Sequence, residues 1–327
     1  MTFAKKASFV VGVSAAAAGL ALPVLAQATI SGAGASFPAA FYQRAFAGVA
    51  NQVRVNYQSV GSGAGVRQFV AGSVDFGATD EPIKASEASK VKRGVIQFPA
   101  VGGTIAVAFN KADCKGLKLS QKQVVDIFLG KINTWDQLKC GKGKLTVAHR
   151  SDGSGTTFAF TNSLSAFSSE WKGKVGEGKS VKWPVGVGGK GNEGVAGLIQ
   201  NTPGAIGYLN QAYVKGVIKA AAVQNKAGKF VLPTEEAGAA ALNNIRLDDN
   251  LAGEDPNPAG ANSYPISTLT WILAYKTGNV DKAPAIRKAM LYLLSPQAQN
   301  QASSLDYVPL KGSILAASKK AVAQIGR

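Results

Sequence analysis

Three short turns rich in glycine, serine and threonine each follow a strand-like segment and precede a helix-like one, at residues 32–38, 61–65 and 150–156. Alternation of strands and helices is typical of an α/β protein, and ligands of open α/β sheets bind at the carboxyl ends of the strands. The first N–H groups of a helix have no intrahelical partner and carry the positive end of its dipole. The sequence therefore predicts a pocket that surrounds a small oxyanion with hydrogen-bond donors.

The order of the segments predicts two lobes, of which the first is discontinuous. Residues 225–262 are rich in loop-forming residues with weak periodicity, and a long apolar strand follows at residues 266–275. We expect this late strand to return the chain to its first lobe. Lobe I would then comprise residues 29–100 plus 263–327, and lobe II residues 101–262, with hinges at 100–101 and 263–264. Two of the glycine turns belong to lobe I and one to lobe II, which places the pocket in the cleft between them.

The first 28 residues have the features of a secretory signal peptide. Lys5 and Lys6 precede an apolar stretch at residues 9–25, and small residues follow it. This pattern predicts export. Cys114 and Cys140 suit an oxidising compartment, so we expect a disulfide between them, with two free buried thiols as the alternative. Two cysteines and one histidine are too few for a typical zinc site, and we expect neither a metal nor a cofactor.

The chain is strongly basic, with 36 Lys and Arg against 19 Asp and Glu and a net charge of +17. Such an excess favours nucleic acid, an anionic surface or a small anion as a partner. The lysines are spread among acidic residues and have no interleaved aromatic residues. This distribution indicates a solvated basic surface, and we expect no binding to nucleic acid.

The motifs of common enzymes are missing from the glycine turns. None of them carries a dinucleotide fingerprint or a serine nucleophile elbow, and residues 186–191 lack the hydroxyl residue that a phosphate loop needs after Lys190. The only histidine, His149, would point away from its neighbour Arg150 on a strand. Asp80 and Asp152 are too few for a metal-dependent phosphatase. We therefore expect a binding protein and not an enzyme.

Asp80 follows a strand-like segment at residues 74–78 and is therefore expected at the edge of the predicted anion pocket. A carboxylate in such a pocket would repel an anion. The repulsion is avoided if the anion carries a proton, as phosphate does near neutral pH and sulfate does not. A carboxylate that must accept this proton would reject the anion that lacks it. Arg150 would supply positive charge, held by Asp152 through a charge-assisted pair. The alternatives are a turn or cap role for Asp80 and a surface ion pair for Arg150 and Asp152.

Several segments resemble the periplasmic phosphate-binding protein of the high-affinity phosphate ABC transporter (PstS type). The likeness is carried by residues 32–38, 59–65, 74–80 and 150–157, and extends to 97–99, 127–135, 183–194 and 203–208. It covers nearly the whole chain after the expected signal peptide and is weakest from about residue 210 to 260.

The resemblance implies a two-lobe, Venus-flytrap periplasmic binding protein of type II-like fold that closes on a dehydrated phosphate. It implies phosphate donors at Ser36, the Phe37 backbone N–H, Ser62, Arg150, Ser154, Gly155 and Thr156. Asp80 would accept the phosphate proton, and Asp152 would hold Arg150. Ser36 stands where some relatives carry threonine, which keeps the hydroxyl. Gly63 stands where relatives can carry a second serine, which puts a donor there in doubt.

A protein of this kind is expected to be a periplasmic monomer that delivers inorganic phosphate to the inner-membrane subunits of an ABC permease. Three alternatives stay open at this point. They are a receptor for another tetrahedral oxyanion such as sulfate or molybdate, a secreted phosphatase with a similar pocket, and a basic envelope protein that binds phosphate incidentally.

Overall fold

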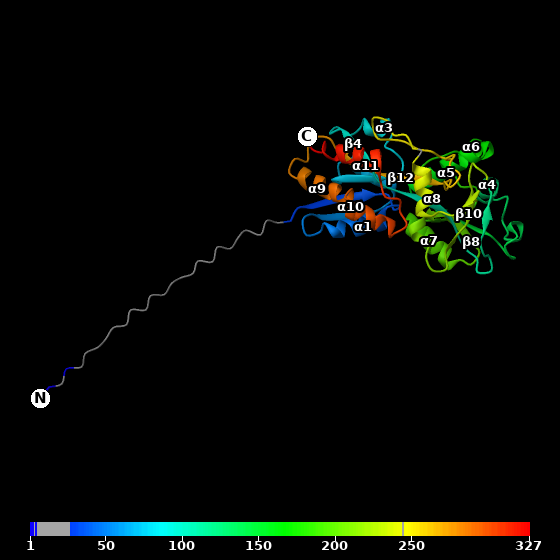
Figure 1. Ribbon diagram of the computed structural model, residues 1–327, viewed down its shortest axis with the longest axis horizontal. Coiled ribbons are helices and arrows are strands. Elements are labelled where there is room, and N and C mark those ends of the chain that lie inside the picture. The colour runs from blue at the N-terminus through cyan, green and yellow to red at the C-terminus, as the bar shows by residue number, and fades with distance from the viewer. Residues whose placement is uncertain (3, 5–26, 244) are drawn as a thin grey trace.

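The computed structural model describes residues 1–2, 4, 27–243 and 245–327 (Figure 1). The expected signal peptide lies almost wholly outside these residues and stays a prediction. Among the described residues, no helix has the length and apolar character needed to cross a membrane.

The largest element of the described structure is a mixed sheet of nine strands. Eight of them follow the order β2-β1-β3-β12-β4-β8-β6-β7, and β9 also pairs with β4. The strands are β1 (Thr29–Gly34), β2 (Arg54–Ser59), β3 (Phe76–Thr79), β4 (Val95–Asn110), β6 (Thr146–Arg150), β7 (Val187–Gly189), β8 (Ala205–Asn210), β9 (Lys219–Ala220) and β12 (Ser267–Tyr275). A small second sheet contains β5 (Lys118–Leu119), β10 (Ala222–Gln224) and β11 (Phe230–Val231). The α/β alternation is therefore confirmed.

Strand β4 belongs to both halves of the large sheet. Its residues from Val95 to Thr104 pair with β12, and those from Ile105 to Asn110 pair with β8. The register with β12 shifts opposite Ala100, because Val101 faces Thr270 while Pro99 faces Trp271. This β-bulge falls at the expected hinge, residues 100–101. The partner of β4 changes from β12 to β8 a few residues later, between Thr104 and Ile105. A bulge bends a strand and increases its twist.

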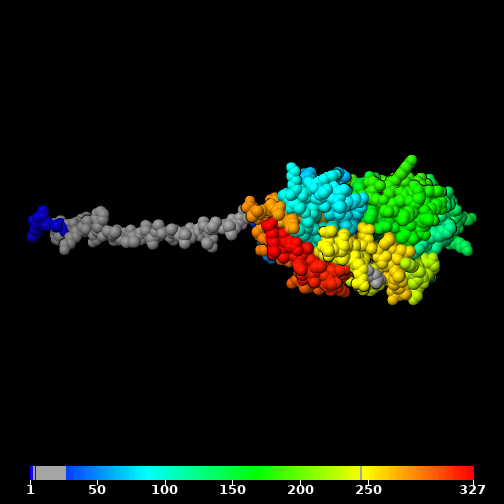
Figure 2. All heavy atoms as spheres, turned by 90° about the horizontal axis from the view of Figure 1, so that it is seen from above, coloured from blue at the N-terminus to red at the C-terminus, as the bar shows by residue number. Residues whose placement is uncertain are grey.

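The helices divide between the two halves of the sheet. Figure 1 shows α1, α9, α10 and α11 beside the first strands and β12, and α4, α5, α6, α7 and α8 toward the other end. Figure 2 shows the same division in space-filling form, with the cyan and red parts of the chain in one half and the green part in the other. The helical bounds are α1 (Ala39–Gly48), α2 (Ser62–Val70), α3 (Ala85–Ala88), α4 (Gln121–Phe128), α5 (Gly155–Phe167), α6 (Ser169–Lys174), α7 (Gly191–Asn201), α8 (Glu235–Leu242), α9 (Ala283–Leu293), α10 (Pro296–Ser303) and α11 (Gly312–Val322), with 3-10 turns η1 (Asp136–Leu138) and η2 (Gln211–Tyr213).

Local signals account for most of these helices. Phe41 and Ala45 of α1 and the following Val49 are buried, as their spacing predicts. The Ser120 hydroxyl accepts from the Gln123 backbone at the start of α4, and the Gln123 side chain accepts from the Ser120 backbone, which confirms the expected capping box. Helix α8, in contrast, lies in the segment expected to be loop-rich. Its alanines give little periodicity, but Thr234 caps it by accepting from the Ala237 N–H.

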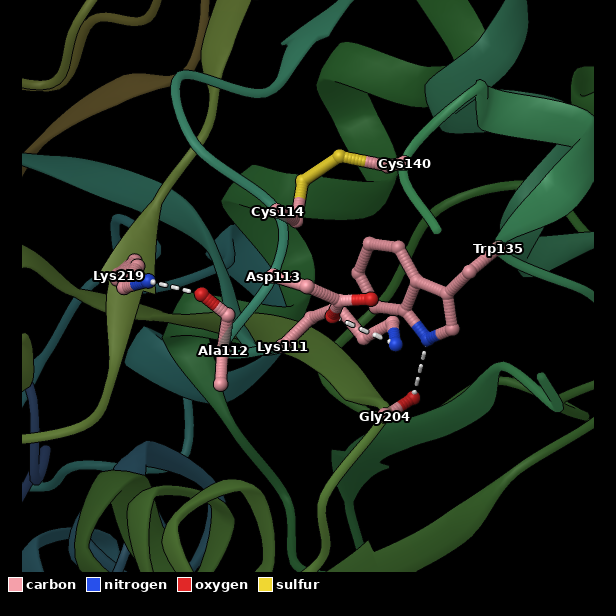
Figure 3. The surroundings of a disulfide bond; sticks show 8 residues. All are labelled: Lys111, Ala112, Asp113, Cys114, Trp135, Cys140, Gly204 and Lys219. Atoms are coloured by element: carbon pink, nitrogen blue, oxygen red, sulfur yellow. Dashed lines mark hydrogen bonds and ion pairs between the residues drawn. A yellow bond between two sulfur atoms is a disulfide. The ribbon is translucent and has the colours of Figure 1, made fainter. Parts of the chain in front are cut away.

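Cys114 and Cys140 form a disulfide, so the alternative of two free thiols is wrong (Figure 3). The bond joins positions separated by 26 residues and encloses β5, α4 and η1. Within this loop the Trp135 side chain is fully buried, and its indole N–H donates to the Gly204 carbonyl at 3.0 Å. The disulfide therefore closes this loop at its two ends, and the indole hydrogen bond ties the loop to Gly204.

Candidate functional site

The structure brings together the three glycine turns, which follow β1, β2 and β6, and Asp80, which follows β3. The Gly63 N–H donates to the Gly153 carbonyl at 2.8 Å, which joins the second turn to the third. The Asp80 N–H faces the Ser62 hydroxyl oxygen at 3.3 Å. The Thr156 hydroxyl donates to Asp80 Oδ2 at 3.2 Å. Residues that are far apart in the sequence thus form one buried polar cluster.

Asp80 lies at the centre of this cluster, with only 1% of its surface exposed. Its Oδ1 accepts from the Thr270 hydroxyl at 2.8 Å, and its Oδ2 accepts from the Thr156 hydroxyl. Burial raises the pKa of this carboxyl to about 7, although the Thr270 hydroxyl and the Arg150 guanidinium both favour its charged form. Near neutral pH, Asp80 is therefore close to the midpoint between acid and carboxylate.

Arg150 is the cation of the site and is itself buried. Its Nε lies 2.7 Å from Asp152 Oδ1 and its Nη2 lies 2.6 Å from Asp152 Oδ2, which makes a bidentate pair. The third nitrogen, Nη1, donates to the Thr156 hydroxyl oxygen at 3.4 Å. Burial opposes ionisation of Asp152, but the guanidinium outweighs it and holds the pKa of Asp152 below its usual range. Because Arg150 is buried and Asp152 is partly buried, the pair is not an exposed surface ion pair. It leaves the free edge of the guanidinium facing Thr156.

The start of α5 packs directly against Asp80. Ser154 is the N-cap, with its hydroxyl oxygen accepting from the Thr157 N–H at 2.9 Å. A Cβ added to Gly155 would lie 2.6 Å from both the Asp80 nitrogen and the Ser62 hydroxyl oxygen. Only glycine therefore lets the helix N-terminus approach this closely.

The first turn contributes Ser36 and Phe37. The Ser36 hydroxyl oxygen accepts from the backbone nitrogen and the side-chain nitrogen of Asn192, each at 2.9 Å. The Phe37 ring is fully buried and lies edge-on to Tyr307, with 6.0 Å between the ring centroids. The Phe37 ring thus lies in the core and takes no part in the polar cluster.

Sequence reasoning missed three residues of this cluster. Asn192 lies in the segment 183–194, which carries only the family resemblance, and Thr270 lies in the apolar segment 266–275. Lys179, whose ammonium lies 2.8 Å from Glu81 Oε2, is one of many scattered lysines. The polar Thr270 inside a buried strand was the clearest available signal. His149, by contrast, is not part of the cluster, since its ring stacks on Trp183 with 5.0 Å between the centroids. In the described part of the chain, no group of three or more His, Cys, Asp or Glu side chains could hold a metal ion.

This fold, with its sheet of two halves joined through β4 and its helix starts converging on one site, is that of a periplasmic binding protein. Residues 21–297 match the PBP superfamily domain. The solved structure of a periplasmic phosphate-binding protein, PfluDING, covers 91% of this chain and 99% of its own with a TM-score of 0.75 at 21% identity. An ABC-type phosphate transport receptor from Vibrio cholerae covers 85% and 99% with a TM-score of 0.58, also at 21% identity. The expected two-lobe α/β fold class is confirmed.

Sequence relatives narrow the assignment to one family. The phosphate-binding protein PstS of Pasteurella multocida is 42% identical over 306 residues, which cover 88% of each chain. The phosphate-binding protein PstS of Methanocaldococcus jannaschii is 35% identical and covers 84% of this chain and 79% of its own. The chain belongs to the PstS family of phosphate-binding proteins.

Proposed function

We propose that this chain binds inorganic phosphate between its two lobes in the periplasm and delivers it to the inner-membrane permease of an ABC transporter, as a monomer and without catalysis. Membership in the PstS family supports this function, because the relatives are named for phosphate binding. The cluster of donors around Asp80 supports it independently, since the donors come from three helix or turn starts and one buried guanidinium.

One observation carries the choice of phosphate over other oxyanions. The carboxyl group of Asp80 is fully buried and lies among hydrogen-bond donors, with the Thr156 and Thr270 hydroxyls both donating to it. Monohydrogen phosphate and dihydrogen phosphate each have an O–H that this carboxylate can accept, whereas sulfate would face it with oxygen lone pairs only. Leaving two buried acceptors unpaired costs on the order of several kcal/mol, which is enough for strong discrimination.

The remaining roles follow from position. Ser36, Ser62, Ser154 and Thr156 would donate through hydroxyls, and Phe37, Gly155 and Thr156 through backbone N–H groups. Arg150 would balance the charge of phosphate while Asp152 holds its guanidinium. The lobes that close on phosphate would be residues 29–100 plus 263–327 and residues 101–262, and β4 would carry one of the two crossings.

Calorimetric titration of the phosphate-stripped protein with phosphate and then sulfate tests the proposal. We expect one tight site for phosphate and no heat from sulfate. Asp80→Asn should bind phosphate more weakly and gain measurable sulfate binding, because an amide can donate to sulfate. Asp75→Asn is the matched control, since Asp75 is also buried but lies at the opposite end of β3, bound to Ser31 and Lys282. Equal binding of both anions by the unaltered protein, or release of phosphate from a model ester, would overturn the proposal.

A further inference from the structure

Asn192 is a fully buried amide at the second position of α7. Its Oδ1 accepts a hydrogen bond from the Asn210 backbone nitrogen at 2.9 Å. A backbone N–H can only donate, so the oxygen of the amide is identified by its partner. The other end of the amide, Nδ2, is therefore a donor, and it points at the candidate site.

This donor is aimed at two hydroxyls that come from different parts of the chain. Nδ2 donates to the Ser36 hydroxyl oxygen at 2.9 Å and to the Thr156 hydroxyl oxygen at 3.2 Å. The Asn192 backbone N–H also donates to the Ser36 oxygen at 2.9 Å. Asn192 thus connects the first glycine turn, in expected lobe I, with the third turn, in expected lobe II.

The consequence for Ser36 follows from the capacity of a hydroxyl. A serine hydroxyl has two lone pairs and one hydrogen. Both lone pairs of Ser36 are used by the two hydrogen bonds from Asn192, and no described residue accepts the Ser36 hydrogen. Ser36 is therefore left able to donate and unable to accept.

Thr156 is constrained in the same way. Its hydroxyl oxygen accepts from Asn192 Nδ2 at 3.2 Å and from Arg150 Nη1 at 3.4 Å, and its hydrogen goes to Asp80 Oδ2 at 3.2 Å. Asn192 and Arg150 together fill the acceptor capacity of this hydroxyl. Its one hydrogen can be given either to Asp80 or to a bound anion next to it.

We propose that Asn192 is a positioning residue that fixes the Ser36 and Thr156 hydroxyls as donors, so that Asp80 is left as the acceptor of the site. This inference rests on the proposed function and deepens it. A serine free to rotate can turn a lone pair toward an anion, and orienting its hydrogen then costs free energy on binding. With Asn192 in place, that orientation is set before the anion arrives. Selectivity for a protonated anion thereby depends on a residue that need not touch the anion.

A double-mutant cycle on phosphate affinity tests the inference. Asn192→Leu keeps the number and branching of the side-chain heavy atoms and adds no charge, but it removes the donor, and we expect at least tenfold weaker phosphate binding. Asn192 acts through the Ser36 hydroxyl, so Asn192→Leu should cost at least fivefold less in a Ser36→Ala background than alone. Ser62→Ala is the matched control, because Ser62 belongs to the same site, and its described hydrogen bond comes from Asp80 and not from Asn192. The fold-loss of phosphate affinity in the Ser62→Ala, Asn192→Leu double variant should equal the product of the fold-losses in the two single variants.

Circular dichroism and thermal unfolding establish that each variant is folded. If Asn192→Leu does not fold, Asn192→Ala replaces it in the same cycle, since it removes the amide without adding a charge. Equal coupling to Ser36 and Ser62, or no coupling to Ser36, would overturn the inference while leaving the proposed function intact. Failure of the unaltered protein to bind phosphate would overturn the proposed function and this inference with it.

Discussion

The ammonium of Lys179 lies 2.8 Å from Glu81 Oε2, and the carbonyl of the same lysine accepts from the Ser154 N–H at 2.8 Å. Glu81 is the residue after Asp80, and Ser154 caps the helix that points at Asp80. The Glu81 and Lys179 side chains are only 4% and 14% exposed. The pair therefore joins the two segments that carry the proposed anion acceptor and the third helix start. In the expected division into lobes, it spans the cleft.

Removing this ion pair should weaken phosphate binding by acting on closure. We expect Lys179→Met to reduce affinity by about five- to thirtyfold, corresponding to about 1–2 kcal/mol, because Glu81 then loses a partner in the closed form. The mutation should mainly raise the dissociation rate of phosphate, since in the proposed closure the pair would form as the lobes meet. Stopped-flow release of phosphate measures this rate.

Lys174→Met is the matched control for Lys179. Lys174 pairs with Glu170 at 2.8 Å within α6, and both side chains are well exposed. Its removal should leave phosphate release unchanged, because exposed pairs of this kind contribute little. Similar release rates for Lys179→Met and Lys174→Met would argue against a role for Lys179 in closure.

Asp80 should make the phosphate-free protein less stable as the pH rises. Its folded-state pKa is about 7 against 3.8 for the ordinary group, so between these pH values the folded state retains a proton that the unfolded state has lost. Stability therefore declines from about pH 4 to pH 7, by an amount on the order of a few kcal/mol. Asp80→Asn should remove this decline and raise the melting temperature at pH 8.

The contribution of Asp75 to stability should change with pH in the opposite direction to that of Asp80. Although its burial favours the neutral acid, hydrogen bonds from Ser31 and Lys282 hold the pKa of Asp75 below its usual range. Its contribution to stability is therefore present above the ordinary pKa and is lost as the pH falls. Asp75→Asn should destabilise the protein at pH 7 and matter less near pH 3. Thermal unfolding from pH 3 to pH 8 that shows parallel curves for both variants would contradict these assignments.

Gly155→Ala should damage the site more than the helix. The added methyl would come within 2.6 Å of the Asp80 nitrogen and the Ser62 hydroxyl oxygen. We expect at least tenfold weaker phosphate binding and a stability loss of about 1–3 kcal/mol, as is usual for overpacking. Gly173→Ala in α6 is the control, because no atom lies within 4 Å of its added methyl. That substitution should raise stability by about 0.5–1 kcal/mol and leave phosphate affinity unchanged in calorimetry.

The disulfide should affect stability and not binding. Its positions are 26 residues apart, so the loop-entropy model gives about 3.5 kcal/mol of stabilisation. Within the described chain, the residues proposed to bind phosphate make no hydrogen bond to the enclosed loop. The Cys114→Ser, Cys140→Ser double variant should unfold at lower denaturant concentration yet bind phosphate within about twofold of the parent. A large loss of affinity in a folded variant would show that the loop influences the site.

Features of this structure that are determined by residues adjacent in the sequence could be predicted. The glycine turns, the capping box at Ser120 and the buried face of α1 each result from a few consecutive residues, and all three are found where the sequence puts them. The proposed donors Ser36 and Thr156 and the proposed acceptor Asp80 could be selected from the sequence because each follows a strand. Their convergence required the further rule that carboxyl ends of parallel strands share an edge.

The missed residues reach the site through pairings that local sequence does not encode. Thr270 faces Asp80 because β12 inserts antiparallel between β3 and β4, an order that the strand sequences alone do not reveal. Asn192 reaches Ser36 because the start of α7 packs across the first turn. Lys179 lies in a segment without secondary structure, so no periodicity marked it. Long-range packing, and not residue type, makes these three part of the cluster.

Strand β4 has a consequence for how the protein folds. Its first residues complete the half of the sheet that contains β12, and its last residues complete the half that contains β8. If one half unfolded alone, its share of β4 would lose its partners and leave unpaired backbone groups at the boundary between Thr104 and Ile105. We therefore expect the two halves to unfold together in a single cooperative transition, because one continuous strand belongs to both.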